Sequence, residues 1–141
     1  PFEKVLDHSG AYLGIKNSDY DYIVLDQPSD HQVCNEVVIV TTLEASSIRA
    51  AERLSFELQE KGIDCTLAVN RFGEHENTVS VERAIDLTHT RLAGVIPYVE
   101  GLGEADTSFE KDNAILNITK RLLGNSVPVF EGSKKKSRLK F

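Results

Sequence analysis

Residues 21–28 read Asp21-Tyr-Ile-Val-Leu-Asp26-Gln-Pro28, and Glu36-Val-Val-Ile-Val-Thr-Thr42 follows close behind. Both stretches contain a short apolar run, and the first run ends in an aspartate and a turn-forming proline. Continuous apolar runs of this length are typical of parallel strands whose two faces are covered by helices. An acid at the carboxyl end of such a strand lies where open α/β sheets bind their ligands. We therefore expect strands over 21–26 and 37–40, with Asp26 at a ligand-binding edge.

The rest of the chain alternates strand-like runs with segments of helical spacing. The expected elements are a loosely helical stretch over 3–16, a helix capped by Ser46 or Ser47 and stopped by Gly62, a strand over 64–70, a helix over 79–88 capped by Thr78 or Ser80, a strand over 93–97, and a last helix from Asp106 or Thr107 to Gly124. This alternation predicts an α/β fold, a mostly parallel sheet covered by helices.

Length and composition indicate one globular domain. The chain has 141 residues, of which 40% are hydrophobic and 27% charged, enough to bury a core. Its two cysteines, Cys34 and Cys65, lack the spacing of a metal site and predict packing thiols in a reduced, cytosolic protein. No stretch approaches the roughly 18 apolar residues of a membrane span. The opening Pro1-Phe2-Glu3 suggests a piece of a longer protein.

Charge is unevenly distributed along the chain. The net charge is −6, yet the last eight residues hold five positive charges, which leaves −11 for the first 133 residues. An acidic body is a poor nucleic-acid binder, so no nucleic-acid partner is expected. We predict a domain over 1–124, then a linker and basic tail over 125–141. The tail is either a solvated end or an anchor on an anionic membrane surface, formed by Lys134, Lys135, Lys136, Arg138 and Lys140.

Three expected strand ends carry the candidate site. Asp26 could hold Mg²⁺ through water beside nucleotide phosphates, or it could cap the turn through Ser29. Asn70 offers a donor and an acceptor that suit the edge of an adenine, or it turns the chain. Pro97 ends the strand over 93–97 on the same edge. The carboxyl ends of parallel strands share one edge, so the three form a joint signal.

Taken in order, Asp-Tyr-Ile-Val-Leu-Asp-Gln-Pro, Glu-Val-Val-Ile-Val-Thr-Thr, Val-Asn-Arg and Gly-Val-Ile-Pro resemble the C-terminal half of a MinD/ParA-type P-loop ATPase, over residues 20 to about 123. Val69-Asn-Arg-Phe72, the following Val79-Ser-Val-Glu82 and the lysine-rich end are most similar to the TadZ/CpaE pilus-assembly branch. The resemblance implies ATP and Mg²⁺ as cofactors. Asp26 would lie on the magnesium side, the pair Asn70 and Arg71 would read the adenine, and Pro97 and Tyr98 would border the base.

The resemblance also implies an ATP-promoted homodimer that recruits the protein partners of a membrane-associated machine, from the cytoplasm or the inner face of the cell membrane. The chain departs from the family in two ways. The glycine-lysine phosphate loop is absent and is expected further upstream, so this piece alone should not hydrolyse ATP. Only nine residues separate Asp26 from Glu36, too few for the three-turn helix that senses the γ-phosphate.

We therefore expect an ATP-binding protein that positions or assembles a membrane-associated machine such as a pilus or secretion apparatus. The alternative is a non-catalytic interaction scaffold that keeps a degenerate ATPase fold.

Overall fold

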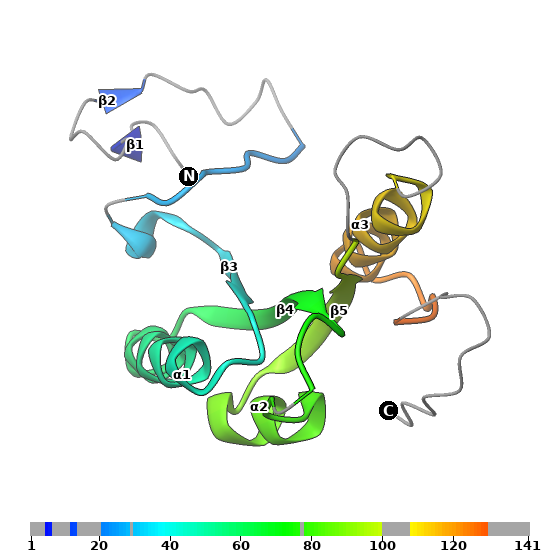
Figure 1. The fold of residues 1–141 in the computed structure, drawn as a ribbon. Helices are drawn as coiled ribbons and strands as arrows, with labels where there is room; N and C mark the ends of the chain where they lie inside the picture. Colours follow the sequence, from blue (N-terminus) through cyan, green and yellow to red (C-terminus); the bar gives the residue numbers. More distant parts are fainter. Residues whose placement is uncertain are drawn as a thin grey trace.

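The structure is a computed structural model that describes residues 5–6, 12–13, 21–28, 30–76, 78–99 and 108–129. Its elements in chain order are β1 (Val5–Leu6), β2 (Tyr12–Leu13), the 3-10 turn η2 (His31–Val33), β3 (Glu36–Thr41), α1 (Ala45–Glu60), β4 (Asp64–Phe72), α2 (Val81–Thr88), β5 (Arg91–Pro97) and α3 (Ser108–Leu122). Strands β3, β4 and β5 form a parallel sheet in that order (Figure 1). This arrangement confirms the predicted α/β class.

The strand register fixes which residues meet at the functional edge. Thr41 of β3 pairs with Val69 of β4, and Phe72 of β4 pairs with Pro97 of β5. All three strands therefore end on the same side of the sheet, which we call the carboxyl edge. The opposite side, where β3 begins at Glu36 beside Asp64, is the amino edge.

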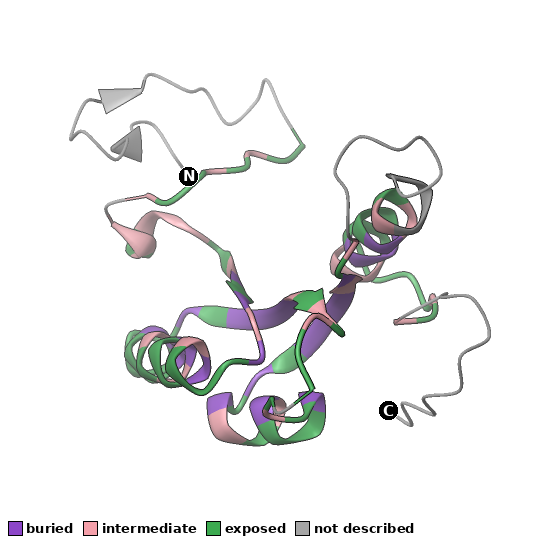
Figure 2. Cartoon of the chain, viewed as in Figure 1, coloured by how far each residue is buried: buried purple, intermediate pink, exposed green. Residues whose placement is uncertain are grey.

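Helices cover the two faces of the sheet unequally. Helices α1 and α2 lie on one face, and α3 packs on the other face against β5 (Figure 1). Leu67 and Val69 of the central strand β4 are fully buried toward α1 and α2, and Ala68 between them is buried toward α3. Buried residues accordingly follow β4 and β5 in Figure 2. Each large apolar side chain buried here contributes roughly 1.5–3 kcal/mol, so this central region stabilises the carboxyl edge.

The predicted strand over 21–26 is wrong in this structure. The segment is extended but pairs with no described strand, and Tyr22 and Val24 are 73% and 92% exposed. An extended chain becomes a strand only when a neighbour completes its hydrogen bonds. Strand β3, the next strand along the chain, pairs with β4 alone among the described residues.

Two further local predictions are wrong. Within 3–16 the described residues form the antiparallel pair β1 and β2, not a helix, in a sequence where Gly10 and Gly14 weaken helical propensity. Helix α1 begins at Ala45, so its cap is Glu44, which makes no side-chain cap hydrogen bond, and Ser46 and Ser47 lie inside the first turn; the hydroxyl of Ser47 accepts from that of Thr42 at 3.0 Å.

Other helix boundaries follow the sequence. Ser80 caps α2 by accepting from the backbone N–H of Arg83 at 3.1 Å, and Gly62 follows α1 with the positive φ of +71° that favours glycine. The predicted cap of α3 at Asp106 or Thr107 lies outside the described residues.

The segment after α3 lies against the domain as far as it is described. The Arg121 guanidinium donates to the carbonyl of Val127 at 3.0 Å and to that of Leu92 at 3.1 Å. Val129 packs on the core beneath α1 and α2. Residues 130–141, which hold the five basic tail residues, lie outside the described part.

Candidate nucleotide-binding edge

Asn70 and Arg71 lie at the carboxyl edge because β4 bulges there. The register between β4 and β5 shifts between Val69 and Phe72, and Arg71 has a positive φ of 56°. A bulge re-aims the side chains of its strand, and such conformations gather at functional sites. The two residues that the sequence singled out therefore lie at one of the two points where the pairing of β4 with β5 is irregular.

The amide of Asn70 has one end occupied. Its Oδ1 accepts a hydrogen bond from the backbone N–H of Arg71 at 2.9 Å, which fixes the oxygen toward the backbone. Within the described part of the chain its Nδ2 meets no hydrogen-bond partner. Asn70 is only partly buried, so the free amide can act as a donor toward a ligand.

Tyr98 joins this edge from β5. Its backbone N–H donates to the carbonyl of Phe72 at 2.9 Å, and the residue is 42% exposed just after the buried Pro97. The guanidinium carbon of Arg71 lies 5.9 Å from the ring centroid, within cation–π range. The structure thus places Asn70, Arg71, Pro97 and Tyr98 at the same edge of the sheet, and their role in binding a nucleotide stays a prediction.

Acidic groups also line the carboxyl edge, a clustering that the order of residues along the chain does not reveal. Arg71 pairs with Glu74, and this hydrogen bond is the main cause that raises the pKa of the Arg71 guanidinium. The His75 Nε2 lies 3.7 Å from a carboxylate oxygen of Glu74 and 3.8 Å from one of Glu44. Glu44 follows β3 and Glu74 follows β4, so only the parallel pairing of these strands reveals that they are neighbours.

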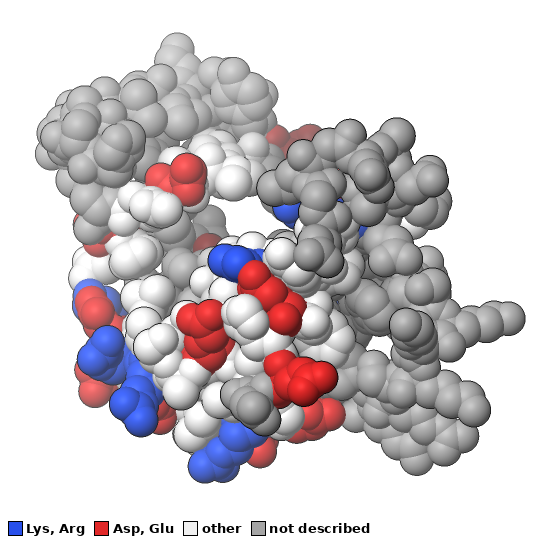
Figure 3. All heavy atoms as spheres, in the orientation of Figure 1, with Lys and Arg blue, Asp and Glu red and all other residues white. Residues whose placement is uncertain are grey.

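Figure 3 shows acidic side chains spread across this face and basic side chains gathered over α1. Negative charge beside Arg71 disfavours an anionic phosphate at that point. A base bound at the edge would therefore direct its phosphates away from Glu44 and Glu74.

Two hollows open near these residues. The one between the turns that follow β3 and β4 holds only about 10 Å³ and is lined partly by Glu44, Arg71 and Glu74. The larger is an open groove of about 430 Å³ between β3 and α1. It is lined by Ile39, Val40, Thr41, Thr42, Ser47, Ala50, Ala51, Leu54 and Asn70. Only the groove has the size of a small-molecule site, and Asn70 is the candidate residue that reaches it.

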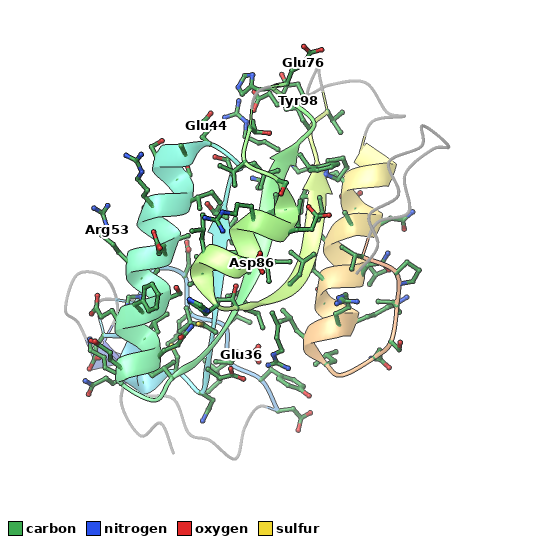
Figure 4. The ribbon with its side chains drawn as sticks, turned by 90° about the horizontal axis from the view of Figure 1, so that it is seen from below. Glu36, Glu44, Arg53, Glu76, Asp86 and Tyr98 are labelled. Atoms are coloured by element: carbon green, nitrogen blue, oxygen red, sulfur yellow. The ribbon has the colours of Figure 1, made fainter. Side chains whose placement is uncertain are left out.

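Asp26 lies elsewhere. Asp30 caps the 3-10 turn η2, which immediately precedes the amino end of β3. The four-residue step from Asp30 back to Asp26 spans at most about 14 Å. Strand β3 alone extends about 20 Å from the amino edge to the carboxyl edge, so Asp26 cannot reach the carboxyl edge from Asp30 along this path. Figure 4 shows Glu36 at one end of the sheet and Glu44 and Tyr98 at the other.

The structure therefore does not bring Asp26 beside Asn70, and a magnesium role for Asp26 stays a prediction. Among the described residues no group of three or more His, Cys, Asp or Glu side chains could hold a metal ion. None of the described helices is long and apolar enough to cross a membrane.

No family model matches the sequence. A MinD relative from Emiliania huxleyi is 32% identical over 136 aligned residues, covering 80% of this chain and 50% of that protein. The septum site-determining protein MinD of Synechocystis sp. is 30% identical over 135 aligned residues, covering 79% of this chain and 51% of its own length. The solved MinD cell division protein of Aquifex aeolicus superposes with a TM-score of 0.68 at 29% identity, over 79% of this chain and 57% of that one.

This chain is similar to MinD in sequence and in fold. A MinC:MinD cell division protein complex from the same organism gives a TM-score of 0.69 at 28% identity, over 82% of this chain and 57% of that one. These likenesses support a place in the MinD/ParA-type superfamily, as the sequence predicted. The chain spans about half the length of the curated MinD relatives it matches. The TadZ/CpaE branch stays a prediction.

Proposed function

We propose that this chain is the part of a MinD/ParA-like ATP-binding protein that recognises the base of the nucleotide. The main observation is the amide of Asn70, whose Nδ2 has no hydrogen-bond partner among the described residues, at the same carboxyl edge of the parallel sheet as Tyr98 in a chain similar to MinD. The open groove that Asn70 lines gives a ligand access to this donor.

The residues of the edge would divide the recognition of adenine. The Nδ2 of Asn70 donates to a ring nitrogen of the base, because its Oδ1 is already engaged by the backbone of Arg71. Pro97 and Tyr98 border the base, and the half-exposed ring of Tyr98 gives it an apolar surface. No glycine-lysine phosphate loop occurs in the sequence, so this part is assigned the base and not the phosphates.

Mg²⁺ would bind through water to Asp26, the role that the family resemblance gives this carboxylate. Bound there, the ion neutralises phosphate charge. Because Asp26 stands near the amino edge in this structure, the role requires residues 21–28 to move to the carboxyl edge.

The cellular role we propose is that of a nucleotide-dependent homodimer in the cytoplasm or at the inner face of the membrane, which positions a pilus or secretion apparatus as in the TadZ/CpaE branch. A solved structural neighbour is a MinC:MinD complex, which supports a protein partner for this fold. The tail residues Lys134, Lys135, Lys136, Arg138 and Lys140 would add about 1 kcal/mol each at an anionic membrane surface.

A second candidate function is a non-catalytic interaction scaffold. The separation of Asp26 from Asn70, with only nine residues between Asp26 and β3, favours it because magnesium would then lack its aspartate.

Calorimetric titration of the full-length protein with ATP and Mg²⁺, combined with a turnover assay, tests both candidates. The ATPase proposal expects saturable binding together with turnover that a partner stimulates. Binding with negligible turnover would favour the scaffold, and an absence of ATP binding would refute the base-recognition site.

A further inference from the structure

The end of β4 forms a tight turn that holds two charged side chains close together. The backbone N–H of Glu74 donates to the carbonyl of Arg71 at 3.3 Å, and Arg71 and Gly73 have positive φ angles of 56° and 87°. The two end residues of such a four-residue turn lie within about 7 Å of each other. The Arg71 guanidinium donates to a carboxylate oxygen of Glu74 across the turn. The pair therefore follows from the backbone conformation of the turn.

Glu74 is the more buried member of the pair. Its side chain is 12% exposed, whereas that of Arg71 is 53% exposed. A carboxylate withdrawn from water needs a positive partner to stay charged, and an arginine is always charged. The other carboxylate oxygen of Glu74 lies 3.7 Å from Nε2 of His75. Both oxygens thus have a neighbour, and Glu74 is a fixed anchor for the exposed guanidinium of Arg71.

The anchored guanidinium also contacts Tyr98. Its carbon lies over the Tyr98 ring, 5.9 Å from the centroid. Tyr98 is 42% exposed, and a side chain this exposed changes rotamer readily unless a contact holds it. A guanidinium stacked on an aromatic face is such a contact. The orientation of the Tyr98 ring therefore depends on Arg71, and the position of Arg71 depends on Glu74.

The same pairing affects how Arg71 would meet a nucleotide. An unpaired arginine binds phosphate through its fork of N–H donors. Here Glu74 occupies part of that fork, and Glu44 lies 3.8 Å from the neighbouring His75. These carboxylates repel an anionic phosphate. Arg71 is thus directed toward the aromatic ring and away from the phosphates.

We propose that Glu74 is a positioning residue for base recognition at the carboxyl edge. It holds Arg71 over one face of the Tyr98 ring, so that the ring presents its opposite face to the base and Arg71 stays off the phosphates. Glu74 itself does not touch the nucleotide. This inference rests on the proposed function, because it concerns how the same edge binds its base.

Calorimetry on the full-length protein with Mg²⁺ tests this role by comparing ATP with inorganic tripolyphosphate, which has phosphates but no base. In E74Q the guanidinium loses its ionic partner, and loss of its contact with the ring predicts that ATP binds roughly two- to fivefold more weakly. The affinity for tripolyphosphate should not fall, because a repelling charge has been removed. The matched control E76Q removes the same charge from an exposed glutamate that points away from the sheet in Figure 4, and it should bind ATP as the parent does.

A double-variant cycle with Y98L tests whether Glu74 acts through the ring. Leucine keeps an apolar side chain but has no aromatic face for a guanidinium. In the Y98L background E74Q should therefore leave ATP affinity nearly unchanged, with urea unfolding showing that each variant is folded. An equal fold-change in both backgrounds would show that Glu74 acts by another route and would overturn the proposal.

The other outcomes separate this inference from the proposed function. Weaker binding of both ATP and tripolyphosphate by E74Q would indicate a general structural role, and an equal loss in E76Q would indicate a general charge effect; either result overturns the proposal. If N70A lowers ATP affinity and E74Q leaves it unchanged, the role of Glu74 is refuted and the base site is kept. A parent protein that binds no ATP would refute both.

Discussion

Replacing Gly94 with alanine tests how closely α3 sits on the sheet. Gly94 lies in β5 directly under Ile118 of α3. A Cβ at this position would overlap Cγ1 of Ile118 and stand 3.2 Å from its Cδ1. Because Cγ1 is next to the branch point and not at the end of a flexible side chain, α3 must shift or Ile118 must leave its rotamer.

The expected cost follows from two opposing terms. Overpacking of a core typically costs about 1–3 kcal/mol. Alanine restricts the unfolded chain more than glycine does, and this effect stabilises the folded protein by about 0.4–1 kcal/mol. We expect G94A to lower the free energy of unfolding by about 1–2 kcal/mol, a fall in Tm of roughly 3–10 °C for a domain of this size.

Urea unfolding followed by circular dichroism measures this difference, and I118A supplies the control. Removing Cγ1 and Cδ1 leaves only the Cβ of residue 118, which stands 3.6 Å from the new methyl group, an ordinary contact. The substitution G94A should therefore cost almost nothing in an I118A background, a coupling of about 1–3 kcal/mol. Equal destabilisation by G94A in both backgrounds, or none in the parent, would refute the described packing of α3 on β5.

Two local predictions complete this set. S80A should lower the free energy of unfolding, measured with urea, by about 1 kcal/mol because it removes the cap of α2. The control S46A changes an exposed serine that caps no helix and should leave the free energy of unfolding nearly unchanged. Equal effects of the two substitutions would contradict the assigned caps. Burial and then the charge of Asp30 raise the pKa of the Cys34 thiol above its ordinary value of 9.0. This contribution to stability is complete below pH 9 and is lost as the pH rises through the folded pKa, so alkylation of Cys34 should lag behind that of a free thiol at pH 8–9; equal rates would contradict it.

The sequence predicts an element correctly where the helix that covers a strand follows that strand directly in the chain. The apolar runs of β3, β4 and β5 and the spacing of α1 and α2 appear as predicted, because each strand is covered by the helix that follows it. The run over 21–26 looks the same in sequence but is no strand, because pairing depends on a neighbour that a one-dimensional pattern does not show.

The same distinction holds for the candidate site, where some features could be predicted from the sequence and others could not. Asn70, Arg71, Pro97 and Tyr98 meet because the register of β4 and β5 was implied by parallel pairing. The positive φ of Arg71 and the acidic groups around it depend on a bulge and on cross-strand distances, which leave no mark in the order of residues. The predicted position of Asp26 at the carboxyl edge depended on a strand over 21–26, and the structure has no strand there.

ATP affinity of the full-length N70A variant, measured by calorimetry with Mg²⁺, tests the assignment of the base to this edge most directly. Loss of one buried hydrogen bond to a ligand typically costs about 1–3 kcal/mol, so we expect binding to weaken by roughly 5–150-fold. The control N35A, on an exposed asparagine before β3, should bind ATP as the parent does. Unchanged ATP affinity in N70A would contradict the claim that Asn70 reads the base.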